Sequence, residues 1–444
     1  MDSPAATQQP RPISDGGIGF ACVEIVIPKP PFARDVSLEE ERAAFEGLKQ
    51  QLRVFWSQVF PRDDQPYTSV VVPSVTPEEQ GPSGNSFLEE RLLFLLIRLR
   101  NPRARLVYVT SQPIHPLVID YYLQLLFGIP GSHARSRLVL LCAHDRSARS
   151  LTQKILDRPR LLERIRAGID DKARAYLSVF ETTPLERRLA VLLGIPLNGL
   201  DPELAGLERA SMARQVFDEA GVRSASDGDT PKASRETPSV EIRINPQAAV
   251  SLSSTHERLR FPPGGAPALL FPANEADRAE LQTAALRIGH VLATRGVASR
   301  CSVEFEAEGR SPERRLLRAR SLRFGMGATT HPMLALRFLT GGRLDPVSGL
   351  FFSPRGEQKF YVSTDDLESD AYQGLLPEDV IEILTINHLS FNQRSETGVL
   401  FHMIDGVSEF GRVGTVAIGN TPAEAQALFE RTIRILDHET RFGR

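Results

Sequence analysis

The sequence has few lysines and few cysteines. Only six of its 53 basic residues are lysines, and arginine supplies the rest. The three cysteines, Cys22, Cys142 and Cys301, lie far apart in the chain and form no Cys-x-x-Cys pair. We therefore expect buried apolar cysteines, because neither a zinc site nor a disulfide framework fits this spacing.

The sequence also lacks the long apolar segments of membrane proteins. No run approaches the roughly 20 apolar residues that a spanning helix needs. Residues 1–16 are rich in Pro, Ser and Gln and contain no apolar core of a signal peptide. We expect a disordered tail there and a soluble, cytoplasmic protein. The formal net charge of −2 gives no general attraction to nucleic acid or to a membrane.

The length of 444 residues predicts more than one domain, because a single core stops growing at about 250–300 residues. In the first part, apolar β-branched runs predict strands and amphipathic runs predict helices in alternation. Ser37 with Glu40, and Ser86 with Glu89, have the spacing of capping boxes. Alternating strands and helices predict an α/β domain with a parallel sheet over residues 17–200. The predicted strands are 19–28, 68–73, 105–110 and 137–142, and the helices are 37–60, 86–100, 116–127, 148–168 and 184–193.

The second part of the chain, residues 201–444, is richer in strands. A helix is expected over residues 208–220, and a Ser-, Asp- and Pro-rich stretch over 223–238 then predicts a linker. After this linker the pattern is typical of an α+β domain. Its expected strands are 239–244, 248–253, 268–271, 301–306 and 314–322, and its expected helices are 275–295, 331–339, 377–386 and 422–437.

Short catalytic motifs are absent. The sequence has no phosphate-binding G-x-x-x-x-G-K-[ST] loop, no G-x-G-x-x-G, no G-x-S-x-G and no H-E-x-x-H. The densest polar cluster runs from Arg323 through Thr329, Thr330 and His331, between a predicted strand and a predicted helix. It fits two roles equally well: the hydroxyls and the helix start could hold an anion, or the segment could be a glycine turn with Thr330 as the N-cap.

Longer segments on both sides of this cluster resemble one family. They include VYVTSQPIHPLVIDYYLQLL, ATTHPMLALRFLTGGRLDP, FYVSTDDL and TGVLFHMIDGVSEFGRVGTVAIGNTPAEA. The chain resembles the pheganomycin-type peptide ligases, which are ATP-grasp carboxylate–amine ligases with a pre-ATP-grasp domain. The resemblance implies a Rossmann-like pre-ATP-grasp domain followed by an ATP-grasp-like domain. It also implies a reaction in which ATP phosphorylates a carboxylate and an amine attacks the acyl phosphate.

The chain departs from this family where ATP and magnesium bind. The nucleotide clamp would stand where only the predicted linker 223–238 is found, and no lysine occurs from residue 233 to residue 358. By resemblance, Glu304 takes the first metal position. The last two metal ligands, an E-x-N pair in the family, fall on Ala319 and Ser321. Alanine offers no ligand atom, so Glu304 is only a weak candidate metal ligand.

Several residues that surround the ligand cleft in the family are retained: Arg323, Thr329, Thr330, His331, Thr255 and His256. They could bind an amino-acid or peptide-like ligand or could hold the fold together, and the sequence slightly favours the second. We therefore expect a degenerate, non-catalytic ligase homologue that binds or scaffolds a protein partner, such as an active ligase, without a cofactor. The alternative is an active ATP-dependent peptide ligase that uses ATP and Mg²⁺, with ATP held in an unusual way or by a partner chain.

Overall fold

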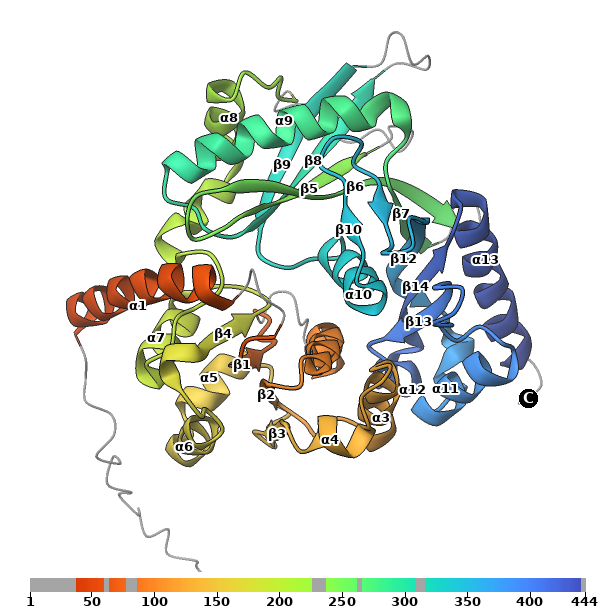
Figure 1. Ribbon diagram of the computed structural model, residues 1–444, viewed down its shortest axis with the longest axis horizontal. Coiled ribbons are helices and arrows are strands. Elements are labelled where there is room, and N and C mark those ends of the chain that lie inside the picture. The colour runs from red at the N-terminus through yellow and green to blue at the C-terminus, as the bar shows by residue number, and fades with distance from the viewer. Residues whose placement is uncertain are drawn as a thin grey trace, which may run out of the picture. The chain divides into compact units, whose positions relative to one another are not determined.

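The computed structural model describes residues 37–59, 64–76, 86–225, 237–261, 266–308 and 316–440 (Figure 1). The predicted tail 1–16, the predicted strand 19–28 and residues 226–236 of the predicted linker lie outside these ranges. The chain from Ser37 onward clusters as one compact unit. The division into two domains at residue 200 therefore stays a prediction.

The first part of the chain contains a parallel four-stranded sheet, as predicted. Its order is β3-β2-β1-β4, and each neighbouring pair runs parallel. The strands β1, β2 and β4 are short apolar runs that are largely buried, which is typical of a parallel sheet covered on both faces, whereas most residues of the edge strand β3 are half-buried. They are β1 (Tyr67–Val72), β2 (Ala104–Thr110), β3 (Leu138–Cys142) and β4 (Ala175–Val179).

Helices connect and cover these strands. The capping box at the start of α1 is confirmed, since the Ser37 and Glu40 backbone N–H groups donate to the Glu40 carboxylate and the Ser37 hydroxyl, respectively. The Ser86 side chain of the second predicted box lies outside the described part of the chain, and the Glu89 carboxylate accepts hydrogen bonds from the backbone N–H and hydroxyl of Ser111. The helices are α1 (Leu38–Val59), η1 (Ser86–Arg100), α3 (Pro116–Gln124), α4 (Gly131–Arg135), α5 (Leu151–Leu156), α6 (Pro159–Ala167), η2 (Lys172–Arg174) and α7 (Pro184–Leu193).

One prediction for this part is wrong, and one strand was missed. The segment 148–168 forms two helices, α5 and α6, rather than one. Pro159 begins α6 and excludes the α conformation at Arg158, which has ψ 84°. The missed strand is β4, a run of five buried residues that follows these helices. Such a short apolar run is hard to distinguish from a helical segment by periodicity alone.

The second part of the chain contains a mostly antiparallel sheet, as predicted. Its strand order is β10-β11-β12-β7-β6-β5-β8-β9, with β14 also paired to β12 and β13 paired to β14. The strands are β5 (Ser239–Ile244), β6 (Val250–Phe261), β7 (Ala266–Phe271), β8 (Arg300–Glu308), β9 (Leu316–Phe324), β10 (Arg343–Leu344), β11 (Phe351–Phe352), β12 (Gln358–Glu368), β13 (Gly398–His402) and β14 (Arg412–Gly419).

Helices pack against both ends of this sheet. In Figure 1, α9 lies across β5 and β6, and α13 lies beside β14 and β12. The α/β fold class is therefore confirmed, with a parallel sheet first and an antiparallel α+β region after it. The remaining helices are η3 (Pro202–Glu208), α8 (Ala210–Glu219), α9 (Glu275–Thr294), α10 (Thr330–Thr340), η5 (Asp370–Gly374), α11 (Pro377–Ile386), α12 (Gly406–Phe410) and α13 (Pro422–Glu439).

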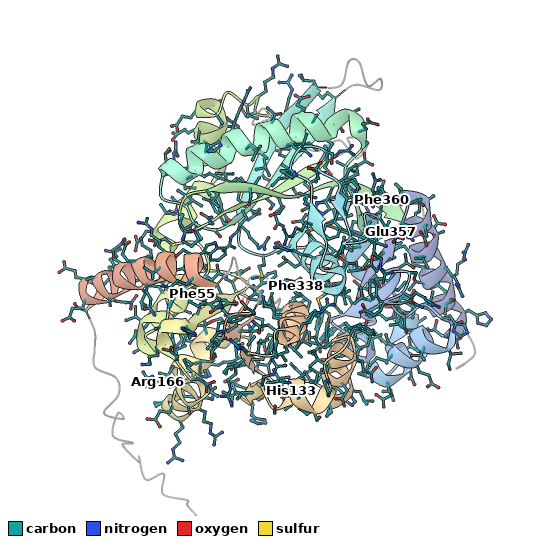
Figure 2. The ribbon with its side chains drawn as sticks, viewed as in Figure 1. Phe55, His133, Arg166, Phe338, Glu357 and Phe360 are labelled. Carbon is teal, nitrogen blue, oxygen red and sulfur yellow. The ribbon has the colours of Figure 1, made fainter. Side chains whose placement is uncertain are left out.

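The largest apolar core joins the two parts. It contains the inner faces of η1 and α3 together with residues of α10, β12, β13 and β14. Phe94 of η1 stacks on Phe338 of α10 with ring centres 6.4 Å apart, and Figure 2 shows Phe338 among the packed side chains there. This contact holds the last part of α10 against η1, and the ring of Phe94 also lies 4.9 Å from that of His331 in the first turn of α10. None of the described helices is long and apolar enough to cross a membrane.

Candidate functional site

The hydroxyls of Thr329 and Thr330 do hold an anion, and it belongs to the chain itself. Both donate to one carboxylate oxygen of Glu241, at 2.8 and 2.7 Å, and Arg300 donates to the other oxygen at 2.7 Å. Glu241 is 1% exposed, so its charge depends on these three donors. The helix α10 begins at Thr330 after Thr329, so the N-cap prediction for Thr330 is wrong.

Thr255 and His256 lie in the interior of the second sheet, on β6. The backbone N–H of Ala273 donates to the Thr255 hydroxyl at 3.2 Å. A ring nitrogen of His256 shares a hydrogen bond of 2.7 Å with the Tyr361 hydroxyl, and burial lowers the pKa of His256 to about 3. Both side chains are fully buried. They form no shared site with Arg323, which is exposed at the end of β9.

Glu304, the candidate metal ligand, is paired with a cation of the chain. Its carboxylate accepts from Arg258 at 3.1 Å and from the Ser321 hydroxyl at 3.1 Å. Further along the same face of β8, Glu306 and Glu308 are likewise paired with arginines of β9. Guanidinium groups thus occupy the places beside each carboxylate where a metal ion would have to approach.

The strand β9 carries a register shift that separates the two other metal positions. Glu304 is opposite Ser321, whereas Phe305 is opposite Ala319. Side chains two residues apart in a regular strand lie on the same face of the sheet. Because of this bulge, the side chains of residues 319 and 321 lie on opposite faces. Ala319 is 1% exposed and belongs to the apolar core, whereas Ser321 lies on the opposite face with Glu304.

The edge of β9 at this point is also occupied. Residues 223–225, the described start of the predicted linker, run beside Ala319. Ser224 and Ala319 form a parallel bridge: the Ala319 N–H donates to the Arg223 carbonyl at 2.7 Å, and the Ala319 carbonyl accepts from the Ala225 N–H at 2.9 Å. The linker therefore begins by extending the sheet at the strand where the family has its E-x-N pair.

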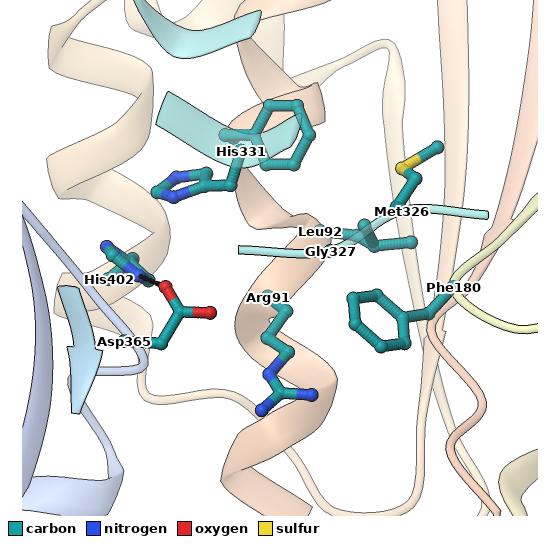
Figure 3. A pocket seen from close by; sticks show the side chains of 9 residues that line it. Arg91, Leu92, Phe180, Met326, Gly327, His331, Asp365 and His402 are labelled. Carbon is teal, nitrogen blue, oxygen red and sulfur yellow. Dashed lines mark hydrogen bonds and ion pairs between the residues drawn. The ribbon is translucent and has the colours of Figure 1, made fainter. Parts of the chain in front are cut away.

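His331 is the predicted residue that lines a pocket, which we call the histidine pocket (Figure 3). The pocket is small and lies between η1, the loop before α10, and strands β12 and β13. Its lining combines aromatic and aliphatic faces with two histidines and a carboxylate. The lining residues are Arg91, Leu92, Phe94, Phe180, Met326, Gly327, His331, Asp365 and His402.

Local irregularities of the backbone position the polar residues of the histidine pocket. Asp365 lies where the pairing of β12 with β14 shifts its register, between Thr364 and Leu367. His402, the last residue of β13, is opposite Gly414 of β14. A Cβ atom at Gly414 would collide with the His402 ring, so glycine is needed there to leave room for the imidazole.

Hydrogen bonding and charge fix the electrostatics of this pocket. His402 Nε2 and Asp365 Oδ1 are 2.8 Å apart. Burial opposes ionisation of Asp365, but the hydrogen bond to His402 and the nearby Arg91 more than offset it, so the pKa of this carboxyl is lowered. Burial, followed by the neighbouring His402, holds the pKa of His331 well below its usual value.

Sequence reasoning found His331 but missed Asp365, His402 and Arg91. Asp365 and His402 both occur in segments that carry the family resemblance, FYVSTDDL and TGVLFHMIDG. The sequence signal that could have identified Asp365 and His402 is a polar residue within an otherwise apolar strand pattern. Whether the retained residues bind a substrate stays a prediction.

Comparison with known proteins supports the resemblance seen in the sequence. A family model described as the PGM1 C-terminal domain matches residues 379–432, which include His402. The L-propargylglycine--L-glutamate ligase of Streptantibioticus cattleyicolor is 23% identical over 421 residues, covering 76% of this chain and 86% of the relative. The chain is similar to a ligase.

The alignment with this ligase contains more positions than this chain contributes residues to it. It extends over 421 residues, which is more than 76% of a 444-residue chain, so the ligase has segments that this chain lacks.

Solved structures that resemble this chain include a carboxylase and a synthetase. N5-carboxyaminoimidazole ribonucleotide synthetase from Thermus thermophilus is 14% identical with a TM-score of 0.45, covering 83% of this chain and 98% of its own. The urea carboxylase of Kluyveromyces lactis is 12% identical with a TM-score of 0.49, covering 82% of this chain and 29% of its own. Because both TM-scores lie below 0.5, these likenesses carry no argument about activity.

Proposed function

We propose that this chain is a degenerate ATP-grasp carboxylate–amine ligase homologue that binds a partner or a small ligand and forms no amide bond. The observation that carries the proposal is the state of the metal positions on β8 and β9. Ala319 points into the apolar core, Ser321 donates to Glu304, and Glu304 pairs with Arg258. Mg²⁺ ions that bridge the phosphates of ATP need unpaired carboxylate or amide oxygens of the protein to hold them, and these positions offer none.

The length of the alignment with the curated ligase agrees with this proposal. The ligase contains segments that have no counterpart here, and the predicted linker stands where the family has its nucleotide clamp. Without a clamp, the triphosphate would lose the lysine and backbone donors that usually neutralise it. We therefore expect no ATP or Mg²⁺ as a cofactor.

The test is calorimetric titration of the purified protein with a non-hydrolysable ATP analogue, with and without Mg²⁺. The proposal expects no heat of binding at millimolar analogue under either condition. It also expects no ADP release from ATP in the presence of amino-acid mixtures that include L-glutamate, which is part of the name of the curated relative. Magnesium-dependent binding would overturn the absence of a nucleotide site.

Matched variants separate true activity from a contaminating ATPase. Glu304→Ala removes the one retained metal position, and Glu308→Ala removes a carboxylate of the same strand that pairs with Arg318. ADP release that is lost in Glu304→Ala but kept in Glu308→Ala would refute the proposal.

The alternative is an active ligase in which ATP is held in an unusual way or by a partner chain. The similarity to 86% of the length of a curated ligase favours it. In that case, ATP and Mg²⁺ would be needed, and an amine such as L-glutamate would be consumed in equal amount with ADP release. If the main proposal holds, the next step is a binding assay with an active ligase from the same source.

A further inference from the structure

Three potential metal-binding side chains meet in the histidine pocket from distant parts of the chain. His331 comes from the first turn of α10, Asp365 from the bulge of β12, and His402 from the end of β13. One ligand atom from each lies within 4.8 Å of the other two. Among the described residues, this is the group of histidines, cysteines and carboxylates that could hold a metal ion.

We propose that His331, Asp365 and His402 bind a divalent transition metal ion, with Zn²⁺ as the best fit. The site lies on elements other than the β8 and β9 positions discussed above. It does not depend on whether the chain binds ATP.

The chemistry of the donors selects the class of ion. Two imidazole nitrogens and one carboxylate oxygen form a ligand set that Zn²⁺ and similar ions use in proteins. Mg²⁺ and Ca²⁺ prefer oxygen ligands and are poorly served by two imidazoles. Three protein ligands leave at least one coordination position for water or another small ligand.

The ligand atoms of the three residues lie within 4.8 Å of one another and must move to the spacing that a bound ion sets. Metal–ligand bonds of about 2.0–2.1 Å place neighbouring ligand atoms roughly 3 to 3.4 Å apart. His402 Nε2 and Asp365 Oδ1 are already 2.8 Å apart, so an ion can replace the proton between them with a small opening of the pair. The His331 and His402 ring centres are 4.0 Å apart, so the two rings must also separate for both to point a nitrogen at one ion.

Unsatisfied nitrogens provide an independent indication. His331 is 8% exposed and His402 is 2% exposed, yet Nδ1 of each finds no hydrogen-bond partner among the described residues. Buried polar atoms are normally paired, and those that are not require an explanation such as an ion or a ligand. Of these two atoms, the unpaired Nδ1 of His331 is available to an ion, whereas His402 would bind the ion through Nε2, the nitrogen that faces Asp365.

Arg91 is the nearby cation that would oppose a metal ion. Its guanidinium lies over the Phe180 ring, 5.0 Å from the ring centre, and Figure 3 shows its side chain extending away from His331. It therefore does not stand between the three ligands. Its charge at the mouth of the pocket would favour an anionic group, such as a carboxylate, at the open coordination position.

The first test is calorimetric titration of the metal-free full-length chain with ZnCl₂, and with MgCl₂ for comparison. We expect one Zn²⁺ per chain and no comparable Mg²⁺ binding. Bound Co²⁺ should show the visible absorption of a four- or five-coordinate site. X-ray absorption on the zinc form should show only nitrogen and oxygen ligands, at about 2.0–2.2 Å.

Variants locate the site. Asp365→Asn and His402→Ala should each weaken Zn²⁺ binding by at least about 100-fold, since the loss of a second-sphere partner alone costs about 10–100-fold. His290→Ala, which removes an exposed histidine of α9, should leave binding unchanged. No zinc binding by the wild-type chain would overturn the proposal even if a variant fails to fold. Equal binding by wild type, Asp365→Asn and His402→Ala would overturn it as well.

Discussion

The strongest prediction concerns Glu241 and tests whether the threonine pair belongs to the fold. Glu241→Ala removes the acceptor of three hydrogen bonds and leaves Arg300, whose side chain is 15% exposed, without this carboxylate. Breaking a buried ion pair by removing one partner costs about 3–5 kcal/mol. We expect a loss of about 4 kcal/mol in the free energy of unfolding, within that range.

The companion variant is Thr330→Ala. Its hydroxyl donates to Glu241 and accepts from the backbone N–H of Gly327 at 3.2 Å, so its loss should cost about 1.5–3 kcal/mol. In the double variant the two losses should not add, because the hydrogen bond between the partners is counted in both. We expect a coupling free energy of about 1–2 kcal/mol.

Urea unfolding followed by tryptophan fluorescence is the assay. Trp56 is the single tryptophan, and the guanidinium of Arg243, two residues from Glu241, lies 4.9 Å from its ring centre. Agreement with the transition seen by far-UV circular dichroism would justify a two-state analysis. Glu308→Ala, which removes a pair with both side chains about one-third exposed, should change stability by less than about 1 kcal/mol. A coupling below about 0.5 kcal/mol would refute the structural role of the threonines.

Three further predictions concern buried groups elsewhere. Because the pKa of His256 is about 3 in the folded chain and ordinarily 6.5, stability should fall by about 1.4 kcal/mol for each pH unit below 6.5, and His256→Gln should remove this loss in urea unfolding across that range. Burial raises the pKa of Glu89 to about 7, so the folded state keeps this carboxyl protonated at a pH at which the unfolded state loses the proton. The free energy of unfolding should therefore decrease as the pH rises from 4.5 to 7. A Glu89→Gln variant whose free energy of unfolding has the same pH dependence would contradict this. Gly414→Ala should destabilise the chain by about 1–3 kcal/mol because the added methyl collides with His402. The measurement is thermal unfolding of both glycine variants. Gly47→Ala, on the open side of α1, should leave the stability unchanged or raise it.

The sequence by itself determined the features that depend on neighbours along the chain. The capping box of Ser37 and Glu40 starts α1 as its spacing predicts, because both partners lie within one helical turn. The apolar runs of β1, β2 and β3 form the parallel sheet expected from their alternation with helices. Even the break before Pro159 was available locally, since proline constrains the residue before it.

Only the tertiary structure decided what the polar residues do. Thr329 and Thr330 could hold an external anion by their own chemistry, and it is Glu241, 88 residues from Thr329 along the chain, that takes this place. The bulge that turns Ala319 into the core arises from the register between β8 and β9. His331, Asp365 and His402 meet because three separate elements pack together. Register and packing depend on contacts between distant segments, and no local pattern of residues specifies them.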